Sequence, residues 1–83
     1  MSICDYIGMR DDKIIVNFGH NLCAERNRRG LSQDELGKLV SIDGTYIGRL
    51  ERGEINPTLT TIVPILNALN VKFETLYNSN NIN

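Results

Sequence analysis

The chain has 83 residues, with nine lysines and arginines against ten aspartates and glutamates, and a net charge of −1. Hydrophobic residues make up 41% of it and charged residues 23%, which excludes disorder throughout and predicts one small globular domain with a single core. The charge argues against a protein that binds polyanions without discrimination. A local basic surface could still bind nucleic acid at a specific site.

Few residues are suited to catalysis or metal binding. Cys4 and Cys23 are the only cysteines and lack a metal-binding spacing, and His20, the single histidine, has no second ligand nearby in the sequence. We therefore expect no catalytic residue, no metal, no cofactor and reduced thiols. No stretch is apolar enough to span a membrane or to act as a signal peptide, so a cytoplasmic protein without membrane contact is expected.

Residues 1–12 are expected to form a loosely held N-terminal arm, because Gly8 and the acidic pair at 11–12 interrupt any regular pattern. A first helix is predicted over residues 12–29, with Gly30 ending it. Its inward-facing stripe, at helical spacing, consists of Ile15, Phe18, Leu22 and Arg26.

A second helix is predicted over residues 33–40. Ser32 is a favourable N-cap, and Glu35 three residues later completes a capping box. Leu36, Leu39 and Val40 form its apolar side. Gly37 lowers helix propensity, but it would allow another helix to cross closely.

A third helix is predicted over residues 44–52, with Asp43 as its N-cap and Gly53 ending it. Ile47 and Leu50 form the side that faces inward. The opposite side is polar and basic, and comprises Thr45, Gly48, Arg49 and Arg52.

Arg26 and Glu51 each continue an apolar stripe on their helices, so each would need a buried partner of opposite charge. We infer an ion pair between them that joins the first helix to the third. Its role would be structural.

A fourth helix is predicted from a cap at Thr58 to its end at Asn70, and Pro64 should kink it or leave the Thr60 carbonyl unpaired. Its apolar stripe comprises Leu59, Ile62, Leu66 and Leu69. A last short helix within residues 71–77 closes the core, and residues 78–83 form a disordered polar tail.

Residues 32–53 resemble the helix-turn-helix of the Cro/C1-type (XRE) family, which includes lambda-type phage repressors and restriction–modification controller proteins. The positions that match its pattern are Gln33, Gly37, Val40, Ile42, Ile47 and Leu50. The flanking segments are similar too, so the resemblance covers about residues 18–77. It implies an all-α, compact five-helix, lambda-repressor-like domain over residues 13–77. Ser41, Gly44 and Pro64 depart from the family pattern.

The resemblance implies that the third helix enters the major groove of double-stranded DNA. Thr45 and Arg49 are the candidates for contacts with base edges, and Gly44 would allow the backbone to approach a base. The candidates for phosphate contacts are Gln33, Tyr46, Arg52, Ser32 and Arg28. Tyr46 could instead pack on the second helix, Gln33 could simply be solvated, and all of these residues together could form an ordinary solvated polar surface.

The expected function is that of a sequence-specific transcription regulator, binding a palindromic operator as a symmetric homodimer. A restriction–modification controller and a phage Cro-like repressor are both compatible with it. The dimer is expected to form through the exposed sides of the last two helices, with Phe73, Leu76 and Tyr77 at the interface, although Phe73 could equally belong to the core. Two alternatives remain open: an antitoxin that binds its operator and a toxin, and a protein-interaction module without a DNA role. A toxin or RNA polymerase is thus a conceivable protein partner.

Overall fold

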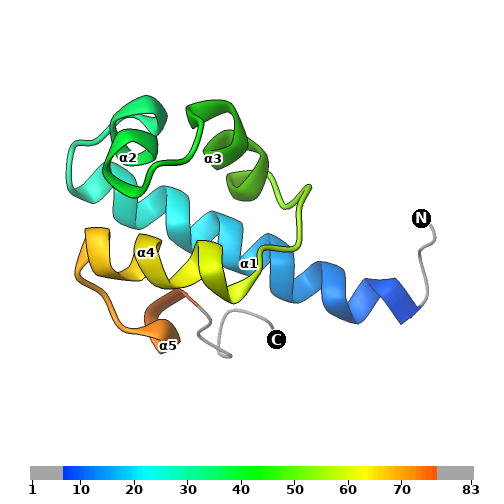
Figure 1. Cartoon of the computed structure of the whole chain (residues 1–83). Coiled ribbons are helices and arrows are strands. Elements are labelled where there is room, and N and C mark those ends of the chain that lie inside the picture. The colour runs from blue at the N-terminus through cyan, green and yellow to red at the C-terminus, as the bar shows by residue number, and fades with distance from the viewer. Residues whose placement is uncertain (1–6, 77–83) are drawn as a thin grey trace.

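The computed structural model describes residues 7–76, with side chains from residue 13 onward, and this part of the chain is all-α (Figure 1). Its five helices are α1 (Ile7–Arg28), α2 (Gln33–Val40), α3 (Gly44–Glu51), α4 (Leu59–Leu69) and α5 (Phe73–Leu76). The predicted five-helix fold is confirmed. Cys4, Tyr77, the start of the predicted arm and the predicted tail lie outside the described residues.

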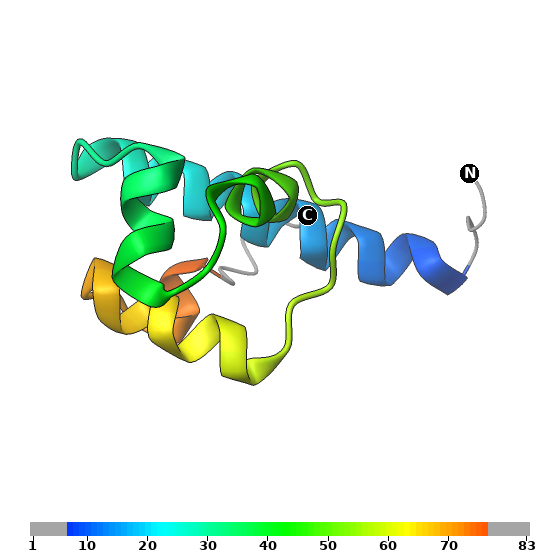
Figure 2. The same ribbon diagram turned by 45° about the horizontal axis from the view of Figure 1, so that its top comes forward.

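The first helix begins at Ile7, five residues before the predicted start at Asp12. Half of the stretch predicted as an arm is therefore helical. A glycine costs a helix only about 1 kcal/mol, and extending a helix that already exists is far easier than nucleating a new one. Figures 1 and 2 show that this N-terminal half of α1 projects beyond the other helices.

The C-terminal half of α1 is the centre of the domain (Figures 1 and 2). α3 packs against α1 and α2, while α4 packs against α2. α5 packs against α1, and the Asn21 side-chain amide donates a 2.8 Å hydrogen bond to the Leu76 carbonyl there. The short helices are thus stabilised by tertiary contacts rather than by their own propensity.

Every helix contributes to one hydrophobic core. Its buried members are Phe18, Leu22, Leu36, Ile47, Leu50, Ile62, Ile65, Leu69 and Leu76. Two residues predicted to face inward are exposed instead: Leu39 is 61% accessible and Leu59 is 68% accessible. Ile65, which was not predicted, is fully buried. A two-turn helix presents only a narrow stripe to the core, so Leu36 and Val40 occupy that stripe in α2 and Leu39 does not.

Two glycines allow backbones to approach closely. A Cβ on Gly19 of α1 would lie 2.7 Å from the Glu51 carbonyl oxygen and would also clash with the Leu50 carbonyl, so the end of α3 could not approach α1. The sequence analysis did not identify this glycine. The close approach expected at Gly37 is confirmed, but the neighbour is the turn after α2: a Cβ there would clash with the Ile42 carbonyl oxygen.

Each of the helices α1 to α4 is followed, within two residues, by a residue with a positive φ angle. Gly30 and Gly53 have φ values of 69° and 74°, as expected for glycines that end helices. Ser41 and Asn70 adopt the same left-handed region, with φ values of 59° and 55°. Asparagine tolerates this conformation, whereas serine is strained in it, which explains why glycine suits position 41.

The start of α4 differs in detail from the prediction. Thr58 occupies the N-cap position, but its hydroxyl makes no capping hydrogen bond and lies 2.8 Å from the Thr60 hydroxyl. α4 runs without interruption through Pro64, which has no N–H to donate to the Thr60 carbonyl.

Candidate nucleic-acid interface

Side-chain caps define the starts of α2 and α3. The Ser32 hydroxyl accepts a 3.0 Å hydrogen bond from the Glu35 N–H, and the Glu35 carboxylate accepts a 2.7 Å bond from the Ser32 N–H. Asp43 accepts a 2.8 Å bond from the Thr45 N–H. The predicted capping box and second N-cap are both present. They set where each helix begins and therefore which residues face outward.

α3 has one buried side and one exposed side. Ile47 and Leu50 are fully buried against the rest of the domain. Thr45 and Arg49 are exposed and lie four residues apart, which places them on the same side of the helix. The outward orientation predicted for these two residues is confirmed.

The two glycines of α3 lie on its inner side, contrary to the prediction. Gly44 is buried against α2: a Cβ there would lie 3.0 Å from the Asp34 Cα and would clash with the Asp34 carboxylate. Gly48 is buried beside Gln33, whose side-chain oxygen would lie 3.1 Å from a Cβ. Close packing of α2 on α3 therefore explains Gly44, and the expectation that Gly44 opens the backbone toward a base is wrong. A Cβ on Gly48 would require only a small shift of the Gln33 and Arg52 side chains.

The predicted ion pair between Arg26 and Glu51 is present and buried. The Arg26 Nε donates to the Glu51 carboxylate at 2.6 Å, and the Nη2 donates to its other oxygen at 3.0 Å. The Arg26 Nη1 also donates to the Leu31 carbonyl at 2.7 Å. The hydrogen bond to Glu51 raises the pKa of Arg26. This pair joins α1 to the C-terminal end of α3.

Gln33 belongs to the same network. Its Nε2 donates a 3.1 Å hydrogen bond to the Glu51 oxygen that also accepts from Arg26. The first residue of α2 is therefore connected to the last residue of α3 by a side chain that was expected to be free for a phosphate or for water. This role could not be read from the sequence, since it requires the two helices to be packed together.

Arg49 of α3 and Arg52, the residue that follows the helix, share one carboxylate. Glu54 lies 2.7 Å from the Arg52 Nε and 3.5 Å from the Arg49 Nε, and all three side chains are about half exposed. The hydrogen bond between Arg52 and Glu54 lowers the pKa of the carboxyl and raises that of the guanidinium. Glu54 was not identified by the sequence analysis as part of this surface.

Arg28 lies at the end of α1 and is paired with an acid. Its guanidinium lies 2.8 Å from the Glu25 carboxylate, which also binds Arg29 at 2.6 Å. The spacings of three and four residues are a sequence signal for these pairs. Arg28 remains largely exposed, so a phosphate contact from it stays a prediction.

Tyr46 is half-buried and packs against the hydrophobic core. Packing is therefore part of its role, and the sequence analysis considered packing beside a phosphate contact. A contact between its hydroxyl and DNA stays a prediction.

The residues expected at the dimer interface differ in their exposure. Leu76 is fully buried in the core, so its predicted contact with a partner subunit is wrong. Phe73 is 51% accessible, and Val63 and Leu59 of α4 are also exposed. Exposed apolar side chains therefore lie on both helices expected to form the interface.

Two further properties concern the described residues only. Nowhere in residues 13–76 do three or more His, Cys, Asp or Glu side chains gather closely enough to bind a metal ion. Among the helices described, none is both long enough and apolar enough to cross a membrane.

The model of the helix-turn-helix family matches residues 24–76, which is more than half of the chain. The chain belongs to the helix-turn-helix family. This is a family of DNA-binding regulators and not of enzymes. The match includes α2 and α3, the two short helices that were predicted to form the helix-turn-helix.

This helix-turn-helix protein is similar to controller proteins of restriction–modification systems. It is 42% identical over 50 residues to the control protein C.SmaI of Serratia marcescens, a match that covers 60% of each chain. The crystal structure of the restriction–modification controller protein C.AhdI from Aeromonas hydrophila superposes with a TM-score of 0.73 and 36% identity. That match covers 76% of this chain and 96% of the other.

Two other relatives carry the same motif. The uncharacterised HTH-type transcriptional regulator y4dJ of Sinorhizobium fredii is 36% identical over 53 residues, which is 64% of this helix-turn-helix protein and 69% of y4dJ. An HTH_3-family transcriptional regulator from Vibrio cholerae superposes with a TM-score of 0.77 and 28% identity over 86% of this chain and 40% of that one.

Proposed function

We propose that the protein is a sequence-specific DNA-binding regulator of transcription whose α3 enters the major groove. One observation carries this proposal: Thr45 and Arg49 project from the exposed side of a helix whose other side is anchored by the core and the Arg26–Glu51 ion pair. Base recognition needs exposed side chains and a helix that is held firmly in position, and this arrangement provides both.

Arg49 and Thr45 would read base edges. An arginine can donate two hydrogen bonds to guanine O6 and N7, and a threonine can contact a thymine methyl group or an acceptor. Phosphate contacts would fix the position of the protein along the duplex without reading sequence. The candidates for these contacts are Gln33, Ser32, Tyr46, Arg28 and Arg52.

The protein would bind DNA as a symmetric homodimer on a palindromic operator, through the exposed apolar residues Leu59, Val63 and Phe73. Recognition helices of such dimers enter successive major grooves about 34–36 Å apart. A role as a restriction–modification controller is supported by the similarity to C.SmaI and by the coverage of nearly the whole length of C.AhdI.

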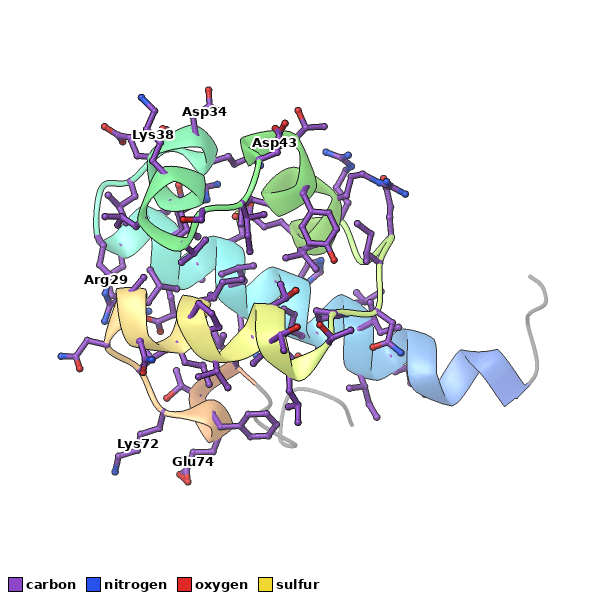
Figure 3. All side chains as sticks on the ribbon, in the orientation of Figure 1. Arg29, Asp34, Lys38, Asp43, Lys72 and Glu74 are labelled. Carbon is purple, nitrogen blue, oxygen red and sulfur yellow. The ribbon has the colours of Figure 1, made fainter. Side chains whose placement is uncertain are left out.

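Selection from a pool of random duplexes, followed by sequencing of the bound DNA, tests the proposal. We expect a two-fold symmetric motif. Arg49→Ala should weaken operator binding by about 1–3 kcal/mol and relax the preference at one position in each half-site. Lys72→Ala removes the same charge on the other side of the molecule (Figure 3) and serves as the control.

Enrichment of no motif by the wild-type protein would contradict sequence-specific binding. A loss in Arg49→Ala that is uniform across all sequences would instead make Arg49 a phosphate contact.

A further inference from the structure

The backbone at the end of α3 places Glu54 beside Arg49 of that helix and Arg52, its C-cap residue. The Gly53 N–H donates to the Leu50 carbonyl at 3.1 Å, and the Glu54 N–H donates to the Arg49 carbonyl at 3.0 Å. With Gly53 at a φ of 74°, these two bonds form a Schellman motif. In this motif the residue after the glycine usually makes an apolar contact with the helix. Here that contact is an ion pair between Glu54 and Arg49.

Glu54 binds both outward-facing guanidinium groups with separate oxygens. Its Oε2 lies 2.7 Å from the Arg52 Nε, and its Oε1 lies 3.5 Å from the Arg49 Nε. A glutamate carboxylate is charged at neutral pH, and the hydrogen bond from Arg52 lowers the pKa of Glu54 further. Two positive charges and one negative charge therefore share a surface that would face a polyanion.

We propose that Glu54 is a specificity-determining residue of this surface, because it binds Arg49 and Arg52 and thereby limits their contacts with phosphates of non-operator DNA. This inference rests on the proposed function. Exposed ion pairs are weak, so a correctly placed guanine can replace Glu54 as the partner of Arg49. On other sequences the carboxylate competes with phosphates for the same cations and repels the DNA backbone.

The charge of the neighbouring surface agrees with this role. Asp34 and Asp43 are exposed at the starts of α2 and α3 and outnumber Lys38, the cation labelled beside them (Figure 3), although Asp43 also caps α3 by accepting from the Thr45 N–H. With a net charge of −1 for the whole chain, non-specific attraction to DNA depends on a few local cations. Removing one acid that binds two of these cations should therefore change non-specific binding measurably.

The test compares Glu54→Gln with the wild-type protein and with Glu74→Gln. The control removes the same charge from α5, on the side away from α2 and α3 (Figure 3). Binding to the selected operator and to a random-sequence duplex is measured by fluorescence anisotropy at several salt concentrations. For Glu54→Gln on random DNA, we expect the slope of log K against log salt to steepen by about 0.9 for each guanidinium that gains a phosphate. The ratio of operator to random affinity should fall, while Glu74→Gln should change neither quantity.

An unchanged slope and an unchanged affinity ratio in Glu54→Gln would overturn the inference. Loss of operator binding with no change on random DNA would also overturn it, because Glu54 would then read a base itself. Failure of the wild-type protein to select any sequence would instead refute the proposed function, so the two failures are distinguishable.

A double-mutant cycle with Arg52 provides a second measurement. In an Arg52→Gln background, Glu54→Gln can free only Arg49, so its effect on the slope should shrink by about half. An effect of the same size in both backgrounds would overturn the role assigned to Arg52. All three side chains are exposed, so these variants leave no buried charge unpaired, and circular dichroism verifies that they fold.

Discussion

Removing Arg26 should destabilise the domain severely. The guanidinium donates two hydrogen bonds to Glu51 and one to the Leu31 carbonyl, and the side chains of the pair are only 10% and 5% accessible. Arg26→Met would leave the buried Glu51 carboxylate with the 3.1 Å hydrogen bond from the Gln33 side-chain amide but without its positively charged partner. Removal of one partner of such a pair typically costs about 3–5 kcal/mol. A domain of this size has a total stability on the order of 4–12 kcal/mol.

Urea unfolding followed by circular dichroism, at one protein concentration and neutral pH, measures this loss. Arg28→Met is the matched control, because Arg28 is largely exposed and Glu25 keeps Arg29 as a partner. Its cost should be about 1 kcal/mol or less. The double variant Arg26→Met/Glu51→Leu should be more stable than Arg26→Met alone, since it leaves no unpaired charge in the interior.

Two results would refute this reasoning. A loss below about 1 kcal/mol in Arg26→Met would mean that Glu51 finds enough solvation without its partner. A double variant whose loss equals the sum of the two single losses would mean that the two residues are not coupled.

Three further predictions concern other parts of the domain. Ser41→Gly should stabilise the protein by about 0.5–1 kcal/mol, since relief of the left-handed conformation exceeds the added entropy of the unfolded chain. Thermal unfolding checks this, and an equal gain in Ser41→Ala, which keeps the Cβ, would contradict it. Val63→Asp should weaken the homodimer at least about tenfold in sedimentation experiments without unfolding the domain, because Val63 is half exposed; an unchanged dissociation constant would exclude α4 from the interface. Arg52→Gln should raise the Glu54 pKa toward its ordinary value of 4.5 in an NMR titration, and no rise would contradict the pairing. Since that pKa is lowered in the folded state, the pair's small stabilising effect is present above the ordinary pKa and disappears as the pH falls through the lowered value.

Much of the local structure could be predicted because its signals lie within a few residues of one another. Ser32 and Glu35 form the predicted capping box, and Gly30 and Gly53 end their helices. The Arg26–Glu51 pair was also predictable, since a charged residue that continues an apolar stripe must be buried and must find a partner. In each case a short-range pattern defines the residue's environment before any packing is known.

Only the tertiary structure decided which side of each short helix is buried and which neighbouring residues bury it. Leu39 and Leu76 are similar apolar residues at helical positions, yet the first is exposed and the second is fully buried. Gly44 and Gly48 face α2 rather than solvent, and Gln33 binds a residue 18 positions away. The physical reason is that hydrophobic periodicity specifies only which stripe of a helix is apolar. How wide the buried part of that stripe is, and which residues cover it, depends on how closely the neighbouring backbones cross. The pairing of Glu54 with two arginines depends in the same way on how the chain turns after Gly53.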